Sequence, residues 1–228
     1  MNGEEFQRVT GYFGAGGACE GQVKKFSAQG MIKGPPAVCE GGPGLWQVIS
    51  KRRSRRDFKN SAMPLADLFQ LLWATQGITG QQGRRAAPSA GHLHPLDTYL
   101  VAGNVAELQA GLYRLRPQEG DLELLETGEE LGHRLSEAAL GQSFVAAANV
   151  SFIWAAVPER STWKYGERSY RYFYLDAGHI CHALYLAATA LGYGACGVGA
   201  FMDDAVNGLL GLDGRASFAV YAAAVGSL

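Results

Sequence analysis

The sequence lacks any apolar run of about 18 residues, and its first residues contain no apolar core segment. A membrane-spanning helix needs a run of that length, and a secretory signal needs such a core. We therefore expect a cytoplasmic protein with no membrane partner.

An excess of charge of one sign is also lacking, because 20 lysines and arginines nearly balance 21 aspartates and glutamates. A net charge of -1 gives no overall field that would attract a polyanion. We therefore expect no nucleic-acid partner, and any basic function must be local.

Cysteine is scarce, and no C-x-x-C pair occurs among Cys19, Cys39, Cys181 and Cys196. This spacing argues against a structural zinc site and a dithiol redox motif. His92 and His94 have no carboxylate or cysteine beside them, so we predict no metal site. Free thiols are the expectation, and pairing of Cys19 with Cys39 stays open as an alternative.

Two regions differ in their residue pattern. Residues 1–44 are rich in glycine and show no sustained period, which predicts an extended arm before one domain at 45–228. Within that domain, helical spacing covers residues 65–72, 129–140 and 173–191, and strand-like runs cover 98–101, 111–115, 121–125, 150–157 and 217–225. This order predicts an α+β fold with helices against a mostly antiparallel sheet.

A basic cluster follows a short helical stripe at residues 45–49. It contains Arg52, Arg53, Ser54 and Arg56. Guanidinium groups offer forked, charge-assisted donors and serine adds a hydroxyl, which together suit a phosphate monoester dianion. The alternative is a solvated helix end.

A second segment, at residues 87–95, combines prolines with small residues. Pro88, Ser89, Ala90 and Gly91 leave the backbone narrow, so a flat ligand could lie directly on the main chain. A tight turn that needs small residues is the alternative.

A third segment, at residues 192–201, is rich in glycine and follows the longest predicted helix. Its Gly197, Val198 and Gly199 could offer backbone donors to a ligand, although the spacing fits neither a phosphate loop nor a dinucleotide fold. A helix end followed by a packed strand is the alternative.

A fourth segment contains Lys164 and Tyr165 side by side. An ammonium group lowers the cost of forming phenolate, so the two could act as an acid/base pair. The alternative is a polar helix start in which Glu167 and Arg171 pair four residues apart.

Together these segments resemble the nitroreductase family, and more narrowly its SagB-type dehydrogenases, from about residue 45 to residue 225. The motifs that carry the resemblance are Ser54-Arg55-Arg56-Asp57-Phe58, Leu72-Trp73-Ala74-Thr75-Gln76-Gly77, Ala87-Pro88-Ser89-Ala90-Gly91 followed by Pro95-Leu96, Trp163-Lys164-Tyr165-Gly166-Glu167-Arg168, and Ala177-Gly178-His179.

The resemblance implies a nitroreductase-like fold, with a long central helix and a domain-swapped type of homodimer, and FMN as cofactor. The arginine cluster (Arg52, Arg53, Ser54 and Arg56) would then hold the FMN phosphate and ribityl chain. Residues Pro88, Ser89, Ala90 and Gly91 would line the flavin ring, and Gly197, Val198 and Gly199 would face its edge.

The SagB-type resemblance also implies a reaction, the oxidation of azoline-type heterocycles in peptides, with Lys164 and Tyr165 as the catalytic base. Removal of a proton from one ring carbon while hydride leaves another requires a base close to the flavin. One alternative is an NAD(P)H-dependent reductase of nitroaromatics or quinones. Another is a flavin-binding module without turnover.

Overall fold

A seven-stranded antiparallel sheet forms the centre of the computed structural model, which describes residues 2–11 and 24–228. The strand order is β1-β4-β3-β2-β5-β7-β6. The strands are β1 (Gly30–Lys33), β2 (Leu96–Ala102), β3 (Gly111–Arg116), β4 (Asp121–Thr127), β5 (Val150–Ala156), β6 (Tyr193–Val198) and β7 (Phe218–Ser227). The predicted α+β fold with an antiparallel sheet is thus confirmed.

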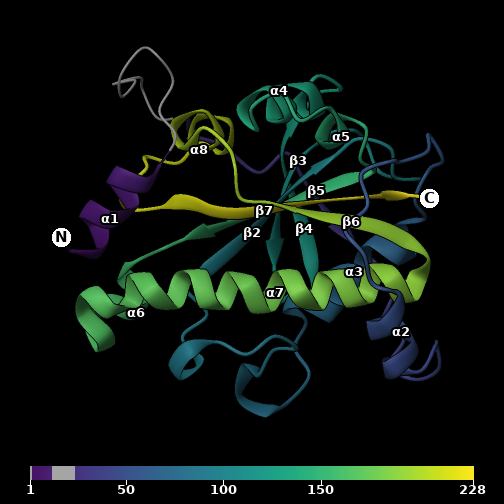
Figure 1. Cartoon of the computed structure of the whole chain (residues 1–228), viewed down its shortest axis with the longest axis horizontal. Helices are drawn as coiled ribbons and strands as arrows, with labels where there is room; N and C mark the ends of the chain where they lie inside the picture. The colour runs from purple at the N-terminus through teal and green to yellow at the C-terminus, as the bar shows by residue number, and fades with distance from the viewer. Residues whose placement is uncertain (1, 12–23) are drawn as a thin grey trace.

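Helices cover both faces of this sheet (Figure 1). One face carries α2 (Leu45–Lys51), α3 (Leu65–Gln76) and α7 (Ser169–Leu191), and the other carries α4 (Leu131–Ala138), α5 (Ser143–Ala146) and α8 (Asp203–Leu210). The remaining helices are α1 (Gly3–Thr10), α6 (Glu159–Tyr165) and three short 3₁₀ turns, η1 (Gln81–Gly83), η2 (Ala90–His92) and η3 (Gly166–Arg168). Within the described residues, none of these helices combines the length and apolarity needed to cross a membrane.

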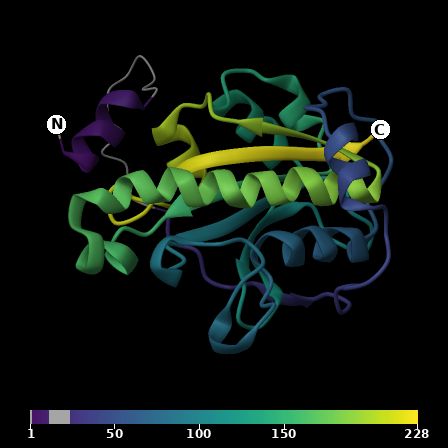
Figure 2. The same cartoon turned by 60° about the horizontal axis from the view of Figure 1, so that its bottom comes forward.

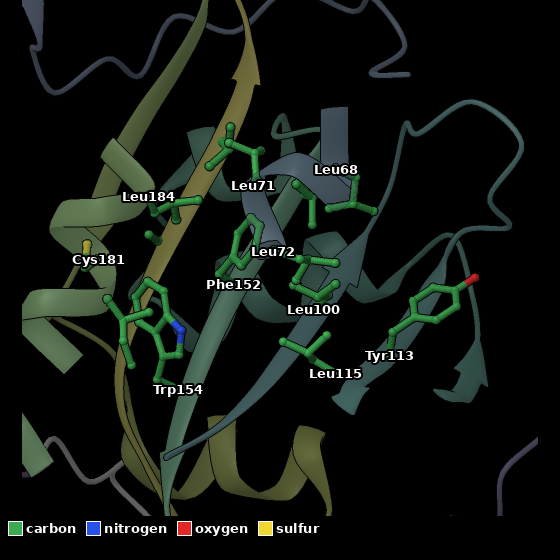
Figure 3. Close-up of a cluster of buried hydrophobic side chains, with 14 of the residues drawn as sticks. Leu68, Leu71, Leu72, Leu100, Tyr113, Leu115, Phe152, Trp154, Cys181 and Leu184 are labelled. Carbon is green, nitrogen blue, oxygen red and sulfur yellow. The ribbon is translucent and has the colours of Figure 1, made fainter. Parts of the chain in front are cut away.

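The sheet separates two apolar cores, because neighbouring residues of a strand face opposite sides. In β5, Phe152 and Trp154 face α3 and α7, whereas Ile153 and Ala155 face α4 and α8. Figure 3 shows the first core, in which Leu100 of β2 lies close to Phe152. Every residue of β5 is buried, as the apolar run predicted for a central strand.

Helix α7 runs along one face of the sheet (Figure 2). Its 23 residues span about 34 Å at 1.5 Å per residue. Phe173, Ile180 and Leu184 of its apolar stripe are buried against the sheet, and the helix ends where Gly192 adopts a left-handed φ of 86°. The predicted central helix and its glycine stop are therefore confirmed.

The segment before residue 45 contains two elements that the sequence pattern did not indicate. Asn2 and Glu5 form a reciprocal capping box that begins α1. Strand β1 pairs antiparallel with β4 at the edge of the sheet. The extended arm therefore contributes secondary structure to the fold, and the division of the chain at residue 44 stays a prediction.

The described cysteines, Cys39, Cys181 and Cys196, are free thiols. Cys39 is exposed and the other two are buried. The alternative pairing of Cys19 with Cys39 involves a residue that lies outside the described part of the chain.

Candidate active site

The arginine cluster leaves α2 in extended conformation and lies beside β6. The Arg55 backbone N–H donates to the Ala195 carbonyl at 2.9 Å. This pairing places the Ser54 hydroxyl 3.1 Å from the Tyr185 hydroxyl of α7, and the Arg52 guanidinium lies 5.3 Å from the centre of the Tyr185 ring. Tyr185 therefore joins two of the predicted phosphate ligands.

Arg53 and Arg56 have other neighbours. Arg53 donates to the carbonyls of Ser50, at 3.1 Å, and of Arg52, at 2.7 Å, where it caps the end of α2. Arg56 lies 5.5 Å from the centre of the Phe144 ring of α5. The structure thus places Arg52 and Ser54 at Tyr185, but it directs Arg53 and Arg56 elsewhere.

The glycine-rich segment forms strand β6 and is not an open loop. The Gly197 N–H donates to the Tyr185 hydroxyl at 2.6 Å, so it is already used within the chain. The Val198 side chain is buried in the second core, and Gly199 follows the end of the strand. The arginine cluster and the glycine-rich segment therefore meet at Tyr185, where the Gly197 N–H is not free for a ligand.

The segment at residues 87–95, called here the Pro-Ser segment, meets the pair Lys164 and Tyr165. A β-carbon built on Gly91 would lie 2.3 Å from the Tyr165 hydroxyl and 2.9 Å from Lys164 Nζ. Gly91 has a φ of 61°, and both side chains converge on its backbone. The Tyr165 ring packs edge-on against Tyr172, with 4.9 Å between ring centres. Lys164, Tyr165 and the Pro-Ser segment thus form one cluster.

Asp176 of α7 holds the Pro-Ser segment from behind. Its carboxylate accepts the Ser89 hydroxyl at 2.5 Å and the Ala90 N–H at 3.1 Å. Sequence reasoning missed both Asp176 and Tyr185. Asp176 carried a usable signal, because it is an acidic residue between Phe173 and Ala177 on the apolar stripe of a predicted helix.

His94 lies at the end of the same turn in an environment that disfavours charge. Burial lowers the pKa of His94 to about 4, and the positive charges of Arg85 and His92 act in the same direction. Its Nε2 atom is buried without a hydrogen-bond partner within the described structure. The adjoining cavity, of about 10 Å³, has room for roughly one water and is too small for a ring-sized ligand.

The two clusters lie toward opposite ends of α7. Helix α6, which carries Lys164, lies at the start of α7, and α2 lies near its end (Figures 1 and 2). Asp176 and Tyr185 are nine residues apart, which corresponds to about 14 Å along the helix axis. The chain therefore carries two separate clusters, called here the arginine half, at Tyr185, and the Lys-Tyr half, at Asp176.

A larger cleft, of about 450 Å³, lies between residues 34–37, the end of α3 and the β3–β4 turn. Phe69, Trp73 and Pro117 supply apolar walls. None of the predicted site residues lines it, although Gln76 borders both this cleft and the small cavity behind Ser89.

Comparison with known proteins identifies the family of this chain. The family model described as "Nitroreductase family" matches residues 49–227. A nitroreductase homologue of Methanocaldococcus jannaschii, MJ1384, is 39% identical over 166 residues, which cover 73% of this chain and 83% of that protein.

Two further similarities extend the comparison. The trifolitoxin-processing protein TfxB of Rhizobium leguminosarum bv. trifolii is 34% identical over 139 residues, or 59% of this chain and 37% of that protein. This chain thus matches little more than a third of the length of TfxB. The crystal structure of a nitroreductase homologue from Ralstonia eutropha JMP134 superposes with a TM-score of 0.76 at 24% identity, over 91% of this chain and 97% of that one.

Proposed function

Because this chain belongs to the nitroreductase family of oxidoreductases, we propose that it is an FMN-dependent enzyme of the SagB type that oxidises azoline-type heterocycles in peptides. The observation that carries this proposal is the convergence of Lys164 and Tyr165 on the backbone of Gly91. Such a dehydrogenation needs a catalytic base beside the flat ring, and Lys164 and Tyr165 can supply it next to this narrow backbone.

The arginine half fits the phosphate end of FMN. No carboxylate pairs with Arg52, Arg53, Arg55 or Arg56 among the ion pairs of residues 2–11 and 24–228, so their charges are available to an anion. The Ser54 hydroxyl is exposed beside Arg52. These two residues would hold the phosphate, and Tyr185 fixes both of them.

The Lys-Tyr half fits the ring end. Ser89 and Ala90 are half-buried and Gly91 is exposed, and these small residues leave a narrow backbone that a flat ring could contact beside Lys164 and Tyr165. FMN, when bound, supplies a two-electron acceptor for hydride. The Tyr165 oxygen or Lys164 Nζ, in its deprotonated form, would take the proton that leaves one carbon of the substrate ring, while the hydride, with two electrons and a second proton, leaves the other carbon.

A peptide substrate is supported by the similarity to TfxB, whose name assigns it to the processing of trifolitoxin. That match and the Lys-Tyr pair favour peptide oxidation over the second candidate, NAD(P)H-dependent reduction of nitroaromatics or quinones. Oxygen or another acceptor would reoxidise the flavin.

We also propose a homodimer, because the arginine half and the Lys-Tyr half lie apart on one chain and a complete site needs both. Leu45, Trp46 and Ile49 of α2 are 56%, 80% and 45% exposed, which leaves an apolar face beside the arginine half. A two-fold axis would bring the arginine half of one protomer to the Lys-Tyr half of its partner. Trp46→Glu should give a monomer by light scattering after size exclusion, whereas Leu140→Glu, at a residue 48% exposed on the far face, should not.

Anaerobic titration of the purified flavoprotein tests the proposed reaction. We expect a thiazoline-containing peptide to bleach the flavin absorbance, and Lys164→Ala to slow this bleaching, while the control Lys59→Ala leaves it unchanged. Rapid bleaching by NADPH with no response to the peptide would favour the reductase. Bleaching by neither would indicate a flavin-binding module without turnover.

The cofactor itself is tested by visible absorbance after purification. The double variant Arg52→Ala with Ser54→Ala should lose the flavin bands, whereas Arg84→Ala, at an exposed arginine of the η1 loop, should retain them. Equal flavin content in both variants would contradict the assignment of the arginine half.

A further inference from the structure

A carboxylate lies buried in the apolar stripe of α7. Asp176 is 3% exposed and lies among Phe173, Ala177 and Ile180, which belong to the first core. No lysine or arginine forms an ion pair with it within the described structure. Burial raises the pKa of Asp176, which shows the cost of placing a carboxylate there. A leucine or alanine would fill this position without that cost.

Both oxygens of this carboxylate contact one turn, residues 89–94. Oδ2 accepts the Ser89 hydroxyl at 2.5 Å, and Oδ1 accepts the Ala90 N–H at 3.1 Å. The Ser89 oxygen in turn accepts the His94 N–H at 2.9 Å. Asp176 and Ser89 thereby connect both ends of the turn to the N-terminal half of α7.

The turn needs such a connection because its backbone is strained. Gly91, His92 and His94 have φ angles of 61°, 60° and 46°. The left-handed region costs non-glycine residues about 1–2 kcal/mol each, so two histidines adopt it only where other contacts hold them. The contacts to Asp176 supply part of that restraint.

We infer that Asp176 is a positioning residue: through Ser89 and Ala90 it holds the turn of residues 89–94 in place against Lys164 and Tyr165. Its importance for catalysis rests on the proposed function, in which this turn supports the flavin ring. The positioning itself is a property of the chain alone.

Backbone hydrogen exchange of the purified protein measures the positioning without any turnover. In Asp176→Ala, exchange of the Ala90 and His94 amides should rise about 10- to 100-fold, the range expected when a hydrogen bond to a charged group is lost. Asp176→Asn should restore most of the protection, because its oxygen can accept the Ala90 N–H and its amide can donate to the Ser89 oxygen.

Two further variants separate this role from a general loss of stability. Asp121→Asn removes another buried carboxylate, which is 2% exposed, lies on β4 and pairs with Arg116 of β3, and should leave Ala90 exchange at the wild-type rate. Ser89→Ala should accelerate exchange at His94, which loses its acceptor, and leave Ala90 protected by Asp176. The exchange pattern of Ser89→Ala tests the positioning role of Asp176 even where Asp176→Ala fails to fold.

Flavin spectra and kinetics then connect positioning to function. Asp176→Ala should retain FMN through the arginine half but lower the maximal rate of flavin reduction about 100-fold, with recovery in Asp176→Asn. Two results would overturn the inference. One is an unchanged exchange rate of the Ala90 amide in folded Asp176→Ala, and the other is accelerated exchange of the Ala90 amide in Ser89→Ala. A wild-type protein that binds no FMN would defeat the proposed function, and the exchange results would still stand.

Discussion

Substitution of Gly91 by alanine tests whether the Pro-Ser segment and the Lys-Tyr pair form one site. The added β-carbon would lie 2.3 Å from the Tyr165 hydroxyl, and ordinary contact begins at about 3.4 Å, so the hydroxyl must retreat by roughly 1 Å. Lys164 Nζ, at 2.9 Å, must also move. A misplacement of about 1 Å in a catalytic arrangement can lower the rate about 100-fold.

A matched control separates this displacement from backbone strain. Gly141 has a φ of 74°, similar to the 61° of Gly91, but a β-carbon built there meets nothing within 4 Å. Both alanine variants should lose about 1–2 kcal/mol of unfolding free energy in urea, the cost of a left-handed non-glycine residue. Only Gly91→Ala should reduce the rate at which substrate bleaches the flavin.

The measurement is stopped-flow reduction of the bound flavin, by whichever donor reduces the wild-type protein, alongside urea unfolding of each variant. Equal reduction rates in Gly91→Ala and Gly141→Ala, with both folded, would refute the reasoning. Lys164 and Tyr165 would then have no role that depends on their contact with this turn.

Three more outcomes are expected. His94→Gln should flatten the pH dependence of the unfolding free energy. Between about pH 6.5 and 4 only the unfolded wild-type chain binds a proton at His94, because the pKa of His94 in the folded protein is lowered to about 4. On acidification through this window the wild-type protein should therefore lose about 1–2 kcal/mol more than the variant, a figure reduced for the partial exposure of His94. Tyr185→Phe should cost about 1 kcal/mol in urea unfolding, because the Gly197 N–H loses its acceptor, and no change would argue against that contact. Leu100→Ala, at a fully buried residue, should cost about 2–5 kcal/mol by the same assay, against under about 0.5 kcal/mol for the exposed Leu140→Ala.

Part of the site could be predicted from sequence, because each segment carries its own chemistry. The residue types at Ser54, Gly91 and Lys164 suggest a phosphate ligand, a narrow backbone and a base. The positions of these segments relative to one another could not be predicted from the sequence. In an extended segment, neighbouring side chains point in different directions, so Arg53 turns back to α2 and Arg56 reaches Phe144. The glycine-rich run became a paired strand whose Gly197 donor is already used.

The sequence by itself determined the long helix and the central strand of the core, since these depend on spacing over a few residues. The stripe from Phe173 to Leu191 gives the long helix, Gly192 ends it, and the apolar run at 150–157 gives the central strand. The tertiary structure alone decided which distant side chains meet. Ser89 and Asp176 are 87 residues apart, and their contact exists because α7 packs across the sheet and brings a buried carboxylate to the turn. Such pairings depend on packing between elements, which local spacing does not encode.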